Sequence, residues 1–327
     1  MERRLERWIL AWVLLLLIPW AVSLCWMQKG KGNMQEEPAA QTEIQTEIQT
    51  EAQTMEAAEV SEMQSEERKI LMEQDGIYTH RNLEDYLPGV VFLQTDFGTE
   101  FEALKCQAVI ARTYICRLMD GKESIDEVEL NLPEMAGSFG KSDETVRALE
   151  LCEQAVRETN GMIMVYEDQC ILPLFHKISS GRTRTGDVDF PYLQAVESSH
   201  DSEAEGYRTE VSWNPSEFAK KIGNDSGMTA ETLISEMQVI QKDDSGYVQK
   251  MKIGAKIYSG EELQYALELP SSCFSIYSYK GSVCARVSGI GHGYGLSQAG
   301  ARAMARDGWG YEEILHYYYK NISIVSE

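Results

Sequence analysis

The segment that decides the fold lies near the C-terminus and reads GHGYGLSQAGARAMA, residues 291–305. Its first three glycines alternate with other residues, and glycine permits positive φ angles and close backbone approach, so we expect a tight loop. The run of Ala, Arg and Met that follows favours a helix. His292 lies in the loop, before the N-terminus of that helix, where polar or anionic ligands bind readily. Taken alone, the segment fits a ligand-binding loop and a structural turn equally well.

Spacing excludes two familiar motifs from this loop. A dinucleotide-binding loop needs a third glycine where this chain has Leu296. In the GxSxG turn of serine hydrolases the serine lies midway between two glycines, but the segment around Ser297 is one residue too long. The loop is therefore not predicted to hold a dinucleotide or a serine nucleophile.

The charge of the chain restricts its partners. The sequence has 327 residues and a formal net charge of -22, and its length allows one or two domains. Residues 1–31 carry +3, residues 32–68 carry -9, and residues 69–327 carry -16. A body this acidic repels phosphate groups, which disfavours nucleic acid and anionic lipid headgroups as partners.

An apolar N-terminal segment predicts a membrane anchor over residues 1–29. Residues 8–27 carry no charge and are long enough to cross a bilayer as a helix. Because Arg3, Arg4 and Arg7 precede this segment, the positive-inside rule predicts a cytoplasmic N-terminus, a single pass through the cell membrane and export of the rest. A cleaved signal peptide is the alternative, although no small-x-small cleavage site follows the segment.

Residues 30–68 are predicted to form a stalk. They contain a four-residue repeat rich in Gln, Thr and Glu and lack the apolar content of a core, so we expect disorder. As a flexible coil the stalk would span on the order of 35 Å.

Residues 69–327 predict one α+β domain of mixed helices and short antiparallel strands, because the two kinds of element do not alternate regularly. A capping box at Thr99 and Glu102 is expected to start a strong helix, and Pro88-Gly89 is expected to break the apolar run before it. Further helices are expected near 144–159, 215–222, 230–237 and 311–319, and strands at 162–166, 170–175 and 247–253.

Three segments of this domain share motifs with one known family. Residues 102–114 read EALKCQAVIARTY, residues 176–183 read HKISSGRT, and residues 291–301 read GHGYGLSQAGA. Together they resemble the helix EALKAQAVAARTY, the loop STSGGRT and the segment GHGVGMSQYGA of the stage II sporulation protein D family, also called the SpoIID/LytB domain. The segments follow the family's order, and the resemblance covers roughly residues 77–320.

The resemblance implies a SpoIID-like domain that acts on the cell wall. Members of this family are similar to lytic transglycosylases: they cut peptidoglycan glycan strands, typically strands from which a partner amidase has removed the stem peptides. In endospore formers they serve engulfment. The implied partners are therefore peptidoglycan glycan strands, a cell-wall amidase and other membrane-anchored wall-remodelling proteins.

One position departs from the family where catalysis depends on it. The family's catalytic acid is the glutamate of a GVVxxEMP pattern, eight residues before the first residue of EALK. Residues 89–96 of this chain read GVVFLQTD, so Gln94 lies where the acid is expected. An amide keeps the shape of a carboxyl group but cannot deliver a proton to the leaving oxygen, a transfer worth about 10²–10⁴-fold in rate.

Three nearby carboxylates are candidates for a relocated acid: Asp96, Glu100 and Glu102. Asp96 is the first of these, since in a strand it would share the face of Gln94 with its carboxyl displaced by about 7 Å. Glu102 is instead expected to cap its own helix.

Six further polar residues at matched positions are predicted to lie in or beside the glycan cleft: Arg112, His176, Ser180, Arg182, His292 and Gln298. Arg112 is expected to orient glycan hydroxyls or to support an acid, and its alternative is a surface arginine on a helix. The other five are expected to bind the glycan.

No metal and no cofactor are predicted. The chain has no HExxH motif, and the paired His and Cys zinc ligands of some relatives are incomplete, since no cysteine lies between His176 and Thr183. The seven cysteines have irregular spacing, so we expect small buried side chains rather than a disulfide framework.

Two functions remain open from the sequence. One is an active glycan-cleaving enzyme whose acid has moved to Asp96. The other, which we favour, is a degenerate member that binds or organises peptidoglycan and its partner enzymes, for example as an amidase-enhancing scaffold during sporulation.

Overall fold

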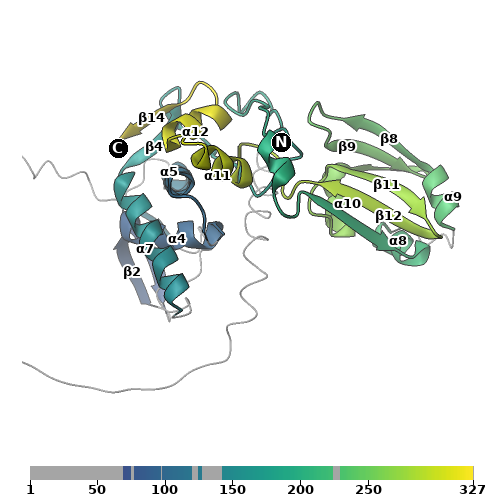
Figure 1. Cartoon of the computed structure of the whole chain (residues 1–327), viewed down its shortest axis with the longest axis horizontal. Coiled ribbons are helices and arrows are strands. Elements are labelled where there is room, and N and C mark those ends of the chain that lie inside the picture. The colour runs from purple at the N-terminus through teal and green to yellow at the C-terminus, as the bar shows by residue number, and fades with distance from the viewer. Residues whose placement is uncertain are drawn as a thin grey trace, which may run out of the picture. The chain divides into compact units, whose positions relative to one another are not determined.

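The computed structural model describes residues 69–74, 77–96, 98–119, 124–126, 142–223 and 229–326 (Figure 1). They fall into two compact units, of which the first holds residues 69–83 and 124–126 and the second holds the other described residues. The predicted anchor and stalk, residues 1–68, lie outside the described residues. Within the part of the chain that the structure describes, no helix combines the length and apolar character needed to span a bilayer.

The first unit contains a small three-stranded sheet. Its central strand is β1 (Lys69–Gln74), which pairs antiparallel with β2 (Ile77–Asn82) and parallel with β3 (Ser124–Asp126). Ile70, on the central strand, is buried.

The second unit is built around helix α5 (Phe101–Met119). The helices α7 (Asp143–Glu158), α11 (Gln298–Arg306) and α12 (Tyr311–Tyr318) pack against it, and so does strand β4 (Met162–Tyr166) (Figure 1). α5 is therefore buried on almost every side, including Gln107 and Arg112, which lie off its predicted apolar stripe. A helix enclosed in this way needs internal partners for its polar side chains.

Helix α4 (Leu83–Gln94) corrects the predicted break at Pro88-Gly89. Pro88 lies inside the helix, which continues to Gln94. The apolar residues Leu83, Tyr86, Leu87, Val90 and Val91 recur at helical spacing and are all buried. Burial of this face outweighs the hydrogen bond that the proline cannot donate. Because Gln94 ends a helix, the expected strand that would place Asp96 on the same face is also wrong.

The predicted capping box of α5 is wrong as well. The Thr99 hydroxyl donates to the Asp96 carbonyl at 2.6 Å. The Glu102 carboxylate accepts a hydrogen bond from the Tyr311 backbone N–H at 2.9 Å and also pairs with Lys105. Glu102 therefore caps α12 rather than its own helix. The predicted helix 144–159 is confirmed as α7, whose N-cap Ser142 accepts from the Thr145 N–H.

Two short strands join the segments that carry the family motifs. β6 (Phe175–His176) pairs in parallel with β13 (Leu296–Ser297), which places the loop after His176 beside the glycine-rich loop before Leu296. β4 pairs with β5 (Gln169–Cys170) and β14 (Ser323–Ser326). The predicted strand 170–175 is thus interrupted, since only its two ends are strands.

Residues 208–288 contribute a second hydrophobic core. It lies among two three-stranded sheets and three helices: β7 (Arg208–Trp213), β11 (Phe274–Tyr279), β12 (Ser282–Ser288), β8 (Met237–Lys242), β9 (Val248–Ile253), β10 (Lys256–Ser259), α8 (Pro215–Lys221), α9 (Ala230–Ser235) and α10 (Gly260–Leu267). Figure 1 shows these elements grouped together, and Trp213, Phe218 and Phe274 are among the residues of their core. The predicted α+β class is confirmed, and the described cysteines are all free.

Candidate functional site

A pocket lies where the predicted family segments meet. Its volume is about 510 Å³, within the usual range for a ligand site. Its walls come from the residues after α4, from α5, from the loop after β6, from the 3₁₀ turn Ser199–Glu203 and from α11. Most of the lining is polar or charged and includes Asp96, Gln107, Lys177, His200, Glu203, Glu205, Gln298, Arg302 and Arg306. A lining of this kind suits a ligand rich in hydroxyl and amide groups.

Three glutamine side chains form a hydrogen-bonded network at this pocket. The Gln107 Nε2 donates to Gln94 Oε1 at 2.8 Å, and Gln298 Nε2 donates to Gln107 Oε1 at 3.2 Å. Gln298 Nε2 also donates to the Gln94 backbone carbonyl at 2.6 Å. Gln298 begins α11, because the Ser297 hydroxyl caps that helix by accepting from Gly300 N–H. The structure thus brings Gln94 and Gln298 together, and adds Gln107, which the sequence did not single out.

Asp96 lines the same pocket, but it is paired. Its Oδ1 lies 3.0 Å from Lys177 Nζ, and both side chains are about half exposed. This contact with the Lys177 ammonium group occupies one oxygen of the carboxylate. The geometry of the pair therefore does not supply the acid that Gln94 lacks.

The other two candidate acids are also occupied. Glu100 holds Arg302 at 3.0 Å and also pairs with Arg306. Burial alone would raise the pKa of Glu100, but the hydrogen bonds from the two arginines outweigh it and lower that pKa. Glu102 is bonded to Tyr311 and Lys105, as described above.

The glycine-rich loop folds as predicted, with positive φ at Gly291, Gly293 and Gly295. A Cβ on Gly295 would lie 1.8 Å from the Leu174 carbonyl oxygen, so only glycine permits this approach of loop and strand. The loop ends in β13, and its backbone is therefore tied to His176 and to the segment that follows it.

His176 is buried and His292 is half-buried, and neither lines the pocket. Their ring centroids are 5.7 Å apart, and His176 is 1% exposed. Because a carbonyl only accepts, His176 Nδ1 donates to the Tyr294 oxygen at 3.0 Å, which leaves Nε2 unprotonated. His292 Nδ1 accepts from Tyr294 N–H at 3.0 Å.

Both imidazoles are neutral at physiological pH. Burial, assisted by the neighbouring His292, lowers the pKa of His176 to about 3. Burial and the charge of Arg184 lower the pKa of His292 to about 4. The main cause is tertiary packing, which removes both rings from water.

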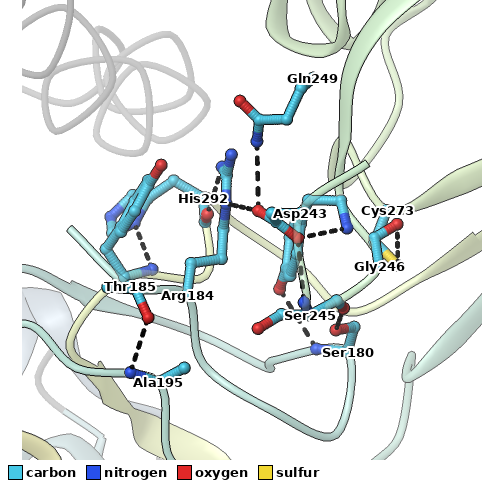
Figure 2. Close-up of polar contacts among 12 residues, drawn as sticks. Ser180, Arg184, Thr185, Ala195, Asp243, Ser245, Gly246, Gln249, Cys273 and His292 are labelled. Atoms are coloured by element: carbon cyan, nitrogen blue, oxygen red, sulfur yellow. Dashed lines mark hydrogen bonds and ion pairs between the residues drawn. The ribbon is translucent and has the colours of Figure 1, made fainter. Parts of the chain in front are cut away.

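A buried arginine, Arg184, connects this loop to distant segments (Figure 2). Its Nε donates to Asp243 Oδ2 at 2.7 Å, and its Nη1 donates to the His292 carbonyl at 3.0 Å. The same Nη1 also donates to Glu261 Oε1 at 3.2 Å. Gln249 also donates to the Asp243 carboxylate. Sequence reasoning missed Arg184, since nothing in the sequence links it to an aspartate 59 residues away.

The Arg184 guanidinium is also enclosed by two aromatic rings. It lies 4.8 Å from the Tyr247 centroid and 4.4 Å from the Tyr294 centroid, and Arg184 is 2% exposed. A Cβ at Gly293 would lie 2.5 Å from Tyr247, so the loop closes directly over this cluster. The cluster therefore fixes the shape of the glycine-rich loop.

Ser180 and Arg182 lie in the loop after β6, outside the lining of the first pocket. The Ser180 hydroxyl donates to the Ser245 carbonyl at 2.9 Å (Figure 2), which is a structural contact. Arg182 Nη1 lies 3.2 Å from Glu197 Oε1. Arg182 lines a second hollow of about 440 Å³, shared with Phe190 and Gln194 among others. Neither residue lines the first pocket, and their predicted role as glycan ligands there stays a prediction.

Asp201 is a buried acid that was also not predicted from the sequence. Its Oδ2 accepts from the Ser179 N–H at 2.7 Å, and the residue is fully buried. Burial raises the pKa of this carboxyl. The bond ties the turn that carries His200 and Glu203 to the loop after β6, and so sets one wall of the pocket.

Arg112 lies neither on the surface nor in the pocket lining. It is fully buried, and its Nε and Nη2 donate to the two carboxylate oxygens of Glu84 at 2.6 and 2.7 Å. Further bonds reach the carbonyls of Met162 and Val156. The alternative of a surface arginine is wrong, and the contacts assign Arg112 to joining α4, α5, α7 and β4.

Comparison with known proteins agrees with the motifs. Residues 73–166 match the SpoIID family model, described as Stage II sporulation protein. The chain is 29% identical over 259 residues to Stage II sporulation protein D of Bacillus subtilis (strain 168), with 74% of each chain covered. It is a relative of the SpoIID proteins. The Stage II sporulation protein D of Bacillus amyloliquefaciens is 28% identical over 257 residues, again with 74% of each chain covered.

The chain is also similar to an uncharacterized protein of Brachyspira hyodysenteriae (strain ATCC 49526 / WA1). That protein is 28% identical over 253 residues, which cover 75% of this chain and 67% of the relative. The SpoIID family match itself includes α4, α5, α7 and β4, and therefore Gln94 and Arg112. The resemblance read from the sequence is confirmed, while the roles of the individual site residues stay predictions.

None of the described residues forms a cluster of three or more His, Cys, Asp and Glu side chains that could hold a metal ion. The paired imidazoles of His176 and His292 are held by backbone groups of Tyr294. What the site offers chemically is therefore a set of amide, hydroxyl and paired charged groups around one pocket.

Proposed function

We propose that this chain binds peptidoglycan glycan strands during cell-wall remodelling in sporulation, and that it binds without cutting them. Its relationship to stage II sporulation D proteins supports the cell-wall setting. The observation that carries the proposal is the glutamine network: Gln94 has no acidic proton, and its side chain is already bonded to Gln107. Amides both donate and accept, so the pocket suits the hydroxyl and acetamido groups of a glycan.

Loss of the acid favours binding over cleavage. Glycosidic cleavage requires a proton donor at the leaving oxygen, and the nearby carboxylates Asp96, Glu100 and Glu102 are each paired with a cation. The pocket shape supported by the Gln107 and Gln298 contacts remains. A protein that keeps the walls and lacks the acid would hold a strand and could present it to a partner such as a cell-wall amidase.

We further propose that residues 1–29 anchor the protein in the cell membrane with its N-terminus in the cytoplasm. The uncharged stretch 8–27 and the three arginines before it support this arrangement. Protease added outside intact spheroplasts should remove the folded part of an anchored chain and leave a short protected N-terminal fragment. Release of the whole chain into the medium would contradict the anchor.

The test of binding against cleavage uses the full chain in detergent and peptide-free glycan strands. We expect the native protein to retain strands in co-sedimentation and to release no anhydro-muramyl products detectable by mass spectrometry. Gln94→Glu should gain products, and Gln238→Glu, an exposed position on β8, should not. Absence of strand binding would overturn the proposal.

One observation favours a second function, an active lytic transglycosylase. Asp96 lines the pocket two residues beyond Gln94. Opening of its ion pair with Lys177 would free a carboxyl group there. Products released by the native protein and lost in Asp96→Asn would establish this alternative.

A further inference from the structure

An exposed tryptophan lies beside the pocket, in the loop between α11 and α12. Trp309 is 39% exposed, whereas Trp213, the other tryptophan of the described residues, is 5% exposed in the second core. Large aromatic side chains contribute most when they are covered, so an exposed indole indicates a contact surface.

The indole is held in place rather than free to move. The Trp309 backbone N–H donates to the Met304 carbonyl at 3.1 Å. Its ring meets Tyr317 edge to face, with centroids 5.9 Å apart and planes at 79°. The Tyr317 hydroxyl in turn donates to the Glu197 carbonyl at 2.7 Å, and its ring meets Tyr318 at 5.3 Å. The two rings are therefore pre-organised, which reduces the entropy lost when a ligand binds.

Contacts connect this aromatic pair to the pocket on one side. Asp307, two residues before Trp309, places its Oδ2 3.7 Å from His200 Nε2. His200 lines the pocket, and so does Arg306, the last residue of α11. The segment that carries Trp309 is thus linked by contacts to the wall of the proposed glycan site.

Contacts also connect the pair to the second hollow. Glu197, which accepts from Tyr317 through its backbone, pairs with Arg182 through its carboxylate. Arg182 lines that hollow together with Phe190. One path of contacts therefore runs from the pocket, past Trp309 and Tyr317, to a second concave surface.

We infer that Trp309 and Tyr317 form an aromatic platform that binds the glycan strand where it leaves the pocket, and that the strand continues toward Arg182. This inference rests on the proposed function. One face of a pyranose ring exposes C–H groups, which pack on an aromatic face, while its hydroxyls bond to polar groups at the rim. A polymer that extends beyond one pocket gains affinity from such a platform, and a short fragment that fills only the pocket does not.

The experiment compares long and short peptide-free peptidoglycan strands with the full chain in detergent. Trp309→Ala should weaken binding of long strands roughly 2- to 12-fold, the equivalent of one aromatic contact. Binding of a single disaccharide should stay unchanged. Trp309→Phe should retain most of the affinity for long strands, which separates loss of the platform from loss of folding.

Two exposed tyrosines away from the platform serve as matched controls. Tyr265 on α10 is 67% exposed and Tyr279 on β11 is 57% exposed, so Tyr265→Ala and Tyr279→Ala remove comparable surface. Both should bind long strands like the native protein. Equal effects of Trp309→Ala and the controls, or an equal loss for disaccharide and long strands, would refute the platform while leaving pocket binding intact. If the native chain binds no glycan at all, the proposed function and this inference both fail.

Discussion

The side-chain amide of Gln107 donates to the side-chain oxygen of Gln94 across 2.8 Å, from the buried centre of α5 to the last residue of α4. Gln107 is 1% exposed, so its amide depends on protein partners. Replacing it by leucine leaves Gln94 and Gln298 without that partner, at a cost of about 1–3 kcal/mol. We therefore expect Gln107→Leu to lower the midpoint of urea unfolding and to weaken glycan binding.

Gln154 offers a control for this change. It lies on α7, and its side-chain amide donates to Glu158 at 2.8 Å, one turn along the same helix. Gln154→Leu should leave both measurements near the native values. Equal destabilisation by the two variants would show that the network contributes no more than an exposed helix pair.

Arg112 should matter more for stability than for ligand binding. Its guanidinium is fully buried against Glu84 and two carbonyls. Breaking a buried pair by removing one partner typically costs about 3–5 kcal/mol. We expect Arg112→Met to reduce the free energy of unfolding by about 3 kcal/mol, the lower end of this range, because Glu84 retains some contact with solvent. A variant that keeps native stability and loses glycan binding would instead show that Arg112 acts in the binding site.

The two neutral histidines predict a loss of stability in acid. The pKa values of His176 and His292 in the folded protein, about 3 and 4, lie below the ordinary value of 6.5. The unfolded chain therefore binds more protons between pH 6.5 and about 4, and stability falls as pH decreases through that range. Each histidine contributes a slope of up to about 1.4 kcal/mol per pH unit.

The variant His292→Gln should flatten this dependence in urea unfolding measured from pH 7 to pH 4.5. Asp201 acts in the opposite direction, because its pKa is raised by burial and its protonation in the folded state favours stability as pH falls. An unchanged slope in His292→Gln would contradict burial of a neutral imidazole at this position.

Gly295 is expected to tolerate no side chain. Its φ is +68°, and an added Cβ would lie 1.8 Å from a backbone oxygen of Leu174. Gly281, in the turn between β11 and β12, has a similar φ of +79° with nothing within 4 Å. Gly281→Ala should cost about 1–2 kcal/mol from the left-handed backbone alone. Gly295→Ala should cost well beyond that, visible as insoluble protein or a much lower melting temperature.

Arg184 is expected to control the mobility of the glycine-rich loop. Lysine keeps the positive charge but cannot reach Asp243, Glu261 and the His292 carbonyl together. Arg184→Lys should therefore speed amide hydrogen exchange at residues 291–296 while exchange in α7 stays native. Uniform acceleration over both regions would indicate global destabilisation rather than release of the loop.

The sequence predicted which segments meet, but not how their side chains are paired. The motifs of α5, the loop after β6 and the loop before α11 placed Gln94 and Gln298 near one pocket, and the structure brings them into contact. Most long helices followed from apolar spacing, because burial of a continuous face dominates local preferences. The spacing from Leu83 to Val91 also fits a helix, but the prediction placed a break at Pro88-Gly89 and was wrong there.

The remaining features depend on contacts between distant segments. The burial of His176 and the pairing of Arg184 with Asp243 arise only after β6, β13 and the β8–β9 turn are assembled. Glu102 shows the same limit on a smaller scale. Its spacing from Thr99 fits a local cap. Its carboxylate instead accepts from the backbone N–H of Tyr311, the first residue of α12, 209 residues away.

The bond between Gln298 and Gln94 joins residues 204 positions apart. During synthesis the N-terminal wall of the pocket emerges long before the C-terminal wall that completes it. Only after α11 has emerged can the glutamine network close, so a stalled or truncated chain presents an open, incomplete site. The complete pocket therefore depends on residues that are synthesised near the end of the chain.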